Sequence, residues 1–151
     1  MNRSTIAFVA GLCTVGTIAL AASHEAPPQI KARQGAMQVV GYNLGLVGGM
    51  ARGDAEYDAA TAQVAADNLV AMSMLHLEPL FPADTLGIEG TRSLPAIAEN
   101  WDGFQEDWET YGTAVAALQA VAGDGLEGVQ AAMGDVGKSC GGCHDDFRLK
   151  N

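Results

Sequence analysis

The chain has 151 residues, with 18 acidic against 8 basic side chains and a formal charge of −10 at neutral pH. This length suits one domain around one hydrophobic core, and 48% hydrophobic against 17% charged residues excludes a disordered chain. The acidic balance argues against nucleic acid and anionic lipid as partners, because both require a basic face. Aromatic residues are scarce, at 6%, which favours closely packed helices over a β-sandwich.

The first segment is predicted to be a signal peptide rather than part of the fold. Arg3 supplies a positive start, residues 6–20 form an uncharged apolar run, and Ala19 and Ala21 are small residues of the kind that signal peptidase reads. The predicted organisation is a cleaved peptide over residues 1–22, which also removes Cys13, and one domain over 23–151. An uncleaved anchor is the alternative, although the run is short for a membrane span. Cleavage would leave a periplasmic protein with no membrane span.

Four segments of the remaining chain have helical periodicity. In chain order they are residues 28–51, 57–77, 95–118 and 126–147. Pro79 and Pro82 stop the second segment, and Pro95 opens the third at a first-turn position. No stretch shows sustained β alternation. Four helices of about twenty residues with three connections predict an all-α fold, an antiparallel four-helix bundle.

Small residues at Gly41, Gly45, Gly48 and Gly49 form a smooth patch on the first predicted helix. Close helix packing within the monomer is one interpretation of this patch. An interface between two subunits is the other, and the sequence leaves both open.

The strongest chemical motif is Cys140-Gly-Gly-Cys143-His144, the C-x-x-C-H signature of haem c attachment. Two thiols three residues apart lie on one face of a helix, where each adds to a vinyl group of the porphyrin. The next residue, His144, then offers an imidazole nitrogen to the iron.

Two other chemistries use closely spaced cysteines. A thioredoxin-like redox pair requires a βαβ pattern, which this chain lacks. A zinc site requires two further ligands at motif spacing, and the other histidines, His24 and His76, have no partner three or four residues away. Haem c is therefore the predicted cofactor.

The motif continues the apolar stripe of the fourth predicted helix, which places the haem in the bundle core. That stripe consists of Leu126, Val129, Met133, Val136, Cys140, Cys143 and Phe147.

Together these features resemble the cytochrome c′ family, the class II cytochromes c, including their low-spin relatives of the c-554 and c-556 type. The segments that carry the resemblance are CGGCHDDFR, ARQGAMQ, AEYDAA, PLFP and TRSLPAI. The resemblance implies an antiparallel four-helix bundle, often a homodimer, with one haem c near the end of the bundle. It also implies a periplasmic protein that acts in electron transfer with periplasmic redox partners or, in the five-coordinate branch, binds nitric oxide or carbon monoxide.

The resemblance further implies roles for individual residues. Cys140 and Cys143 would be the thioether attachments, and His144 would be the proximal ligand of the iron. Met37 matches the residue that faces the distal side of the iron, which makes it the candidate second metal ligand. The remaining matches to haem-contacting positions are Arg33, Gln34, Thr91, Arg92 and Arg148, the last of these beside the proximal histidine.

Simpler interpretations remain for some of these residues. Arg33, on an otherwise apolar stripe, is also compatible with a long side chain that reaches to solvent. Met37 is also compatible with plain filling of the core. His76 is expected to be a partly exposed helix residue, and His24 lies in the segment before the first helix.

Two functions from different classes follow. The first is a mono-haem carrier of electrons, and the alternative is a five-coordinate protein that binds nitric oxide or carbon monoxide. An enzyme ranks below both, because no residue set in the sequence supplies a proton relay at the distal side.

Overall fold

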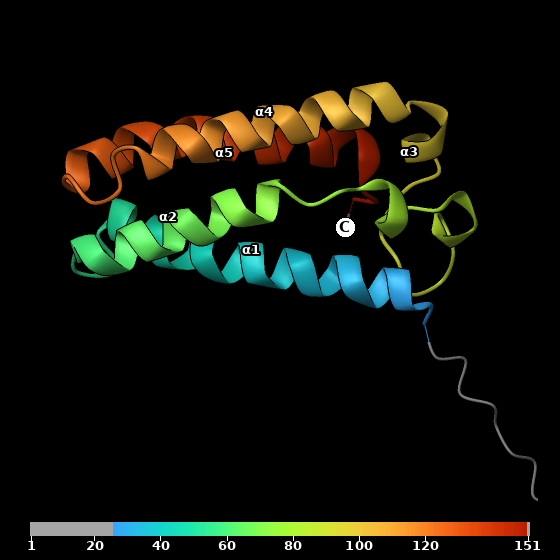
Figure 1. Cartoon of the computed structure of the whole chain (residues 1–151), viewed down its shortest axis with the longest axis horizontal. Coiled ribbons are helices and arrows are strands. Elements are labelled where there is room, and N and C mark those ends of the chain that lie inside the picture. The colour runs from blue at the N-terminus through green and yellow to red at the C-terminus, as the bar shows by residue number, and fades with distance from the viewer. Residues whose placement is uncertain (1–25, 151) are drawn as a thin grey trace, which may run out of the picture.

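The computed structural model describes residues 26–150, and the predicted signal peptide lies outside them. Four long helices make up the bundle: α1 (Pro28–Arg52), α2 (Ala59–Ser73), α4 (Trp101–Gln119) and α5 (Leu126–Phe147). Helix α1 packs on α2, α2 on α4, α4 on α5, and α5 on α1, which closes the bundle. Successive helices run in opposite directions (Figure 1), so the predicted antiparallel four-helix bundle is confirmed.

Helix α1 follows the prediction closely at both ends. Pro28 stands in its first turn, where a missing N–H costs nothing. The helix ends at Arg52 and is capped by Gly53, whose φ of 78° is accessible to glycine. The backbone N–H of Gly53 donates to Met50 O at 3.1 Å.

The second helix is shorter than predicted. It begins after Asp58, whose carboxylate accepts from the Thr61 N–H at 2.7 Å, and it ends at Ser73 rather than at residue 77. The carbonyl of Ser73 accepts from the indole Nε1–H of Trp108 at 2.9 Å, and this contact replaces the helical bond that would continue α2. His76 consequently lies exposed in the connection, and the prediction of a helical residue there was wrong.

The long connection contains two short 3₁₀ helices, η1 (Glu78–Leu80) and η2 (Ala83–Thr85). After it, the predicted third helix is interrupted. A short α3 (Ala96–Glu99) stops at Asn100, which has φ −135° and ψ 63°. The side chain of Asn100 accepts from the Gly103 N–H at 3.2 Å and so caps the start of α4. The prediction of one continuous helix over residues 95–118 was therefore wrong, because the Asn100 side chain caps the start of a new helix.

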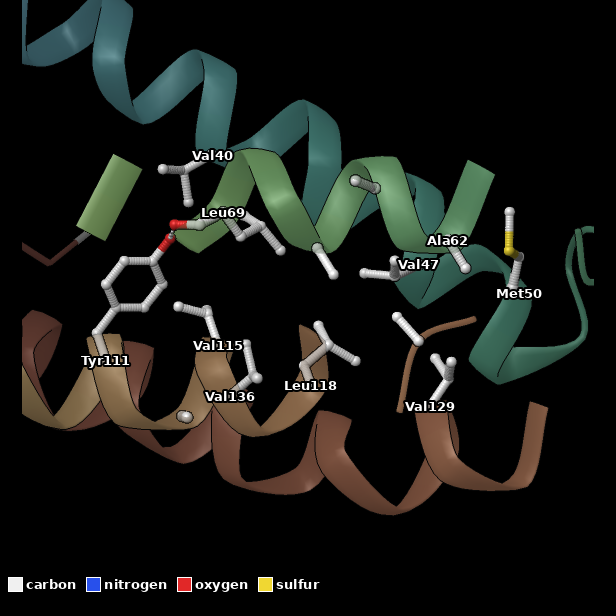
Figure 2. Close-up of a cluster of buried hydrophobic side chains, with 14 residues drawn as sticks. Val40, Val47, Met50, Ala62, Leu69, Tyr111, Val115, Leu118, Val129 and Val136 are labelled. Carbon is white, nitrogen blue, oxygen red and sulfur yellow. Dashed lines mark hydrogen bonds between the residues drawn. The ribbon is translucent and has the colours of Figure 1, made fainter. Parts of the chain in front are cut away.

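The core is divided into two clusters along the bundle. The larger cluster, shown in Figure 2, lies between all four long helices, and the Tyr111 hydroxyl donates to Leu69 O within it at 3.3 Å. The smaller cluster joins the long connection to α3, α4 and the end of α5. It consists of Leu77, Leu86, Ile97, Phe104 and Phe147. Among the described residues, no part of α1 before Val40 belongs to either cluster.

The predicted glycine patch divides between the interior and the surface. Gly48 lies within the bundle, where a side chain at its position would meet the Met133 Cε of α5 at 3.7 Å. Gly41 and Gly45 are exposed on the outer face of α1, with no other side chain close to them.

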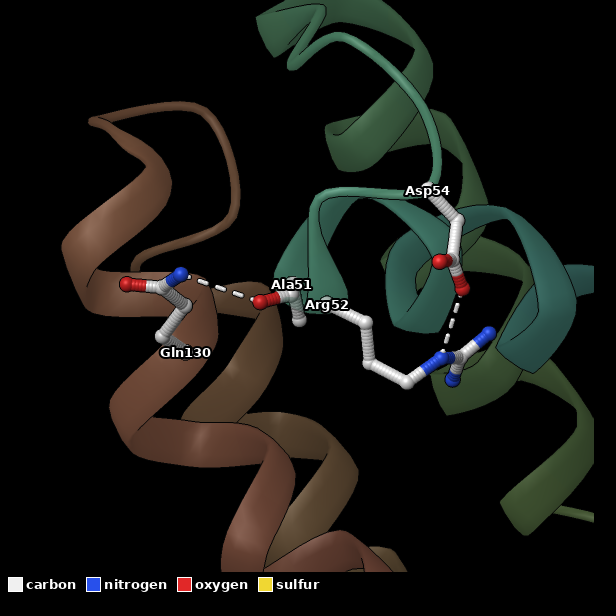
Figure 3. A network of polar contacts seen from close by, with 4 residues as sticks. All are labelled: Ala51, Arg52, Asp54 and Gln130. Atoms are coloured by element: carbon white, nitrogen blue, oxygen red, sulfur yellow. Dashed lines mark hydrogen bonds and ion pairs between the residues drawn. The ribbon is translucent and has the colours of Figure 1, made fainter.

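At the end of the bundle away from the cysteines, polar contacts join α1 to α5 and to the turn after α1, as Figure 3 shows. The Gln130 side chain of α5 donates to Ala51 O of α1 at 2.9 Å, and Arg52 pairs with Asp54 at 2.8 Å. Exposed contacts of this kind contribute little stability, so the apolar core carries the fold. Within the described part of the chain, no helix is long and apolar enough to cross a membrane.

Candidate haem site

The two cysteines lie on one face of α5, between the two core clusters. Cys140 packs against the larger cluster and Cys143 against the smaller one. Both thiols are half-buried and free. The antiparallel arrangement places this half of α5 at the same end of the bundle as the N-terminal half of α1 (Figure 1). A flat apolar group attached to both thiols would therefore face that half of α1.

The electrostatics of the thiols differ from those that are typical of a redox-active dithiol. Burial raises the pKa of Cys140, and burial together with the nearby groups Asp107, Cys140 and Asp146 raises the pKa of Cys143 to about 11. Redox-active and metal-binding cysteines show the opposite shift, because their chemistry depends on the thiolate. Moreover, among residues 26–150 no three His, Cys, Asp or Glu side chains are grouped closely enough to hold a metal ion.

His144 follows Cys143 on the same turn and is half-buried. Burial, and after it the positive charges of Arg148 and Arg92, lower its pKa, while Asp145 acts weakly in the other direction. The neutral imidazole, which carries the lone pair that a metal requires, is therefore the favoured form.

Arg33 is almost completely enclosed, with only 5% of its surface exposed, so the interpretation as a side chain reaching to solvent was wrong. Its guanidinium donates to Leu80 O at 3.0 Å, to the Thr85 Oγ1 at 2.8 Å and to Thr85 O at 2.7 Å. A fourth bond, at 2.7 Å, goes to the Thr91 Oγ1. These bonds attach the long connection to α1, and the guanidinium also lies 5.2 Å from the centre of the Phe81 ring.

The long connection is attached on its other side to the end of α5. Leu94 N–H donates to Phe147 O at 3.0 Å, and Leu149 N–H donates to Arg92 O at 2.8 Å. The Arg92 side chain also donates to Leu149 O, with its Nε at 3.0 Å. Thr91 and Arg92 thus lie where α1, the connection and α5 meet. Gln34 is exposed beside them and donates to Gly90 O at 2.8 Å.

Met37 and Arg148 lie at the borders of this region. Met37 is one helical turn after Arg33, is 41% exposed and belongs to neither core cluster, so plain core filling was wrong for it. Arg148 follows the last residue of α5 in an extended conformation, and its charge lies close enough to His144 to lower the pKa of the imidazole.

Comparison with known proteins agrees with this arrangement. Residues 28–148 match the family described as Cytochrome C′. This chain belongs to the cytochrome c′ family. It is 41% identical to a cytochrome c′ of Halomonas halodenitrificans, over 78% of this chain and 93% of the relative. It is 40% identical to cytochrome c-554 of Cereibacter sphaeroides, over 81% of this chain and 93% of that protein.

A solved structure supports the same assignment. The structure titled cytochrome c′ from Rhodobacter Spheriodes superimposes with a TM-score of 0.80 at 37% identity, over 84% of this chain and 99% of that one. The resemblance predicted from the sequence is therefore confirmed. Haem c is the cofactor of this cytochrome, and Cys140 and Cys143 occupy its attachment motif.

The residues of the site also fit haem c on chemical grounds. Two half-buried thiols three residues apart suit the two vinyl groups. The Nε of Arg33 is buried and has no hydrogen-bond partner among the described residues. A buried cationic donor of this kind suits a carboxylate, such as a haem propionate.

Three residues near the site of this cytochrome were missed by sequence reasoning. Thr85 is buried and accepts from Arg33 through both its hydroxyl and its carbonyl. The Phe81 ring lies under the Arg33 guanidinium and 4.9 Å from the Phe104 ring. Asp107 of α4 lies close to Cys143. Phe81 lies in the PLFP segment, which contributed to the resemblance but gave this residue no role. No local sequence pattern distinguished Thr85 or Asp107.

Proposed function

We propose that this cytochrome carries single electrons in the periplasm, with haem c attached at Cys140 and Cys143 and its iron bound by His144. The observation that carries the proposal is the position of the half-buried His144 imidazole directly after two half-buried thiols on α5. Haem iron bound by a protein imidazole supplies a one-electron couple. The surrounding residues orient the group and limit its contact with water, and no catalytic turnover is proposed.

The second axial position decides how the iron would function, and we propose Met37 for it. Arg33 and Met37 are four residues apart on α1, so their side chains leave the same face of the helix. Among the described residues, Met37 packs into neither core cluster, which leaves its thioether available as a ligand. A thioether opposite histidine is typical of electron-transfer cytochromes.

The alternative function is the capture of nitric oxide or carbon monoxide at an open iron position. The exposure of Met37, at 41%, supports this alternative as well, because a partly exposed side chain can turn away from the iron. Sequence identity does not separate the two functions, because the chain is 41% identical to a cytochrome c′ and 40% identical to a cytochrome c-554.

Optical spectra of the native protein and of Met37→Ala distinguish the two functions. If Met37 binds the iron, we expect low-spin spectra in both oxidation states, slow or absent binding of carbon monoxide, and a high-spin ferric spectrum in Met37→Ala. Met74→Ala is the matched control, because Met74 is 72% exposed just after α2, and its spectrum should equal the native one. A high-spin ferric spectrum of the native protein at neutral pH would refute the Met-ligated form and support gas binding.

We further propose that two copies of the chain associate through the outer face of α1. Val39 and Tyr42 are 46% and 69% exposed there, beside the uncovered Gly41 and Gly45. Exposed apolar side chains around small residues allow the close approach of a second helix.

Replacing Tyr42 by glutamate is expected to convert the dimer to a monomer, because a charge would be buried without a partner. Sedimentation velocity measures the change, and Val64→Glu is the control, since Val64 is 59% exposed on α2 outside the patch. A native protein that sediments as a monomer at high concentration would contradict the proposal.

A further inference from the structure

The surface that α2 and α4 form together differs in charge from the rest of the molecule. Residues 53–91 and 93–137 contain no Lys or Arg at all, and these two stretches include both helices. The basic side chains of the described chain lie on α1, on α5 and beside the end of α5. They are Lys31, Arg33, Arg52, Arg92, Lys138, Arg148 and Lys150. The α2–α4 surface therefore has no cation of its own except Arg92 in the connection between the helices. Its negative charge comes mainly from α4, with Asp102, Glu106, Asp107 and Glu109, because α2 contributes only Asp67.

A cavity of about 260 Å³ opens on this surface, at the end of the bundle that contains the cysteines. Its wall comes from the segment after α2 and from the middle of α4. The lining residues are Leu75, His76, Leu77, Glu78, Gln105, Trp108 and Glu109. Glu78 and Glu109 are exposed, and neither carboxylate has an ion-pair or hydrogen-bond partner within residues 26–150. The acidic stripe continues along α4 through Asp102 and Glu106.

Trp108 connects the cavity to the cofactor region. The indole lines the cavity, is half-buried and packs against both core clusters. Cys143 packs against the smaller of the same two clusters. The Nε1–H bond to Ser73 O holds the ring in place, and the Tyr111 ring lies 5.2 Å away. An aromatic side chain of the cavity wall thus packs against the same cluster as the thiol that attaches the haem.

We propose that this cavity docks a lysine or arginine side chain from the basic surface of a redox partner protein. The two carboxylates attract the cation, and the Trp108 ring in the cavity wall adds the attraction of an aromatic ring for a cation. The acidic α2–α4 surface steers the partner toward the cavity before contact. The inference rests on the proposed electron-carrier function, since it names the kind of partner and the place where that partner binds.

A second acidic cavity at the opposite end of the bundle provides a matched control. It is lined by Val121, Asp124, Gly125, Leu126, Glu127, Gly128 and Ala131, and so has two carboxylates but no aromatic side chain. Glu127 precedes Cys143 by sixteen residues on α5, which at 1.5 Å per residue separates the two by about 24 Å. Neutralising both carboxylates at either cavity changes the net charge equally.

The binding test uses the ferric holoprotein and, as probe, a lysine-rich basic cytochrome c of the mitochondrial type, also ferric. Two ferric proteins exchange no electrons, so calorimetric titration at low ionic strength measures docking alone. We expect the native protein to bind the probe, Glu78→Gln/Glu109→Gln to bind it about tenfold more weakly, and Asp124→Asn/Glu127→Gln to stay within about twofold of native. Absence of native binding, or equal weakening in both double variants, would overturn the docking site.

Electron transfer is measured separately, from the ferrous holoprotein to the ferric probe and to ferricyanide. Docking at the cavity predicts that Glu78→Gln/Glu109→Gln slows transfer to the basic probe but not to the small anion. An equal loss with both oxidants would overturn the docking site. If the native protein binds the probe yet reduces neither oxidant, the electron-carrier function fails while the docking surface stands.

Discussion

A variant with serine at both Cys140 and Cys143 is expected to carry no covalently attached haem. A serine hydroxyl does not form the thioether that joins the two half-buried thiols of α5 to the porphyrin. Denaturing electrophoresis followed by a haem stain should show colour that migrates with the native chain and none with the double variant. Each single variant should keep a weaker band.

The same measurement includes its control. Ser139→Ala changes the neighbouring buried residue, whose hydroxyl donates to Val136 O, and leaves both thiols in place. It should stain like the native chain. Colour that acid–acetone extracts from the native protein would contradict covalent attachment.

Loss of the haem should also loosen the fold. The macrocycle would lie between the two core clusters, where Cys140 contacts one cluster and Cys143 the other. A void of that size costs several kcal/mol, a large part of the roughly 5–15 kcal/mol by which a domain is stable. A double variant that melts at the same temperature as the holoprotein would show that the haem does not support the core.

Replacing Arg33 by methionine is expected to lower the free energy of unfolding by about 3 kcal/mol. The guanidinium makes four hydrogen bonds to Leu80, Thr85 and Thr91, and an apolar side chain of similar length leaves those acceptors without a donor. Urea unfolding of the holoprotein, followed by circular dichroism, measures the change.

Gln34→Met provides the matched control, because it makes the same kind of replacement at the next residue. Gln34 is exposed and makes one hydrogen bond, to Gly90 O, so its loss should cost less than about 1 kcal/mol. Equal destabilisation by the two variants would show that Arg33 does not hold the connection.

Hydrogen exchange then locates the effect of Arg33→Met. The amides of Leu94 and Leu149 join the long connection to the end of α5, by bonds to Phe147 O and Arg92 O. If Arg33 positions that connection, both amides should exchange faster in Arg33→Met, beyond the change in global stability. Unchanged exchange at both amides would confine the role of Arg33 to its own contacts with residues 80–91 and would separate it from the junction with α5.

The sequence alone predicted the number of long helices, their antiparallel order and the course of α1 and α5. Apolar periodicity is a local signal, and a helix of more than twenty residues repeats its pattern often enough to be recognised. The cysteines and His144 were also predicted, because five consecutive residues contain the whole attachment motif.

Helix ends depended on contacts between segments far apart in the chain. The indole of Trp108 ends α2 by taking the carbonyl of Ser73, 35 residues earlier. The break at Asn100 rests on a local cap, yet an asparagine also occurs inside helices, as Asn43 does in α1. Differences in helix propensity of a few tenths of a kcal/mol do not determine whether an asparagine caps a helix or lies inside one.

For the candidate site, the sequence by itself determined which residues have the chemistry to hold a haem, namely two thiols, an imidazole and a cationic side chain. Only the tertiary structure decided that Arg33 is buried and that its partners are Thr85 and Thr91, more than fifty residues away. The same holds for the cavity lined by Trp108, whose carboxylates Glu78 and Glu109 come from different elements. The physical reason is that burial and hydrogen-bond partners are properties of packed surfaces, and these surfaces form only when the helices have packed against one another.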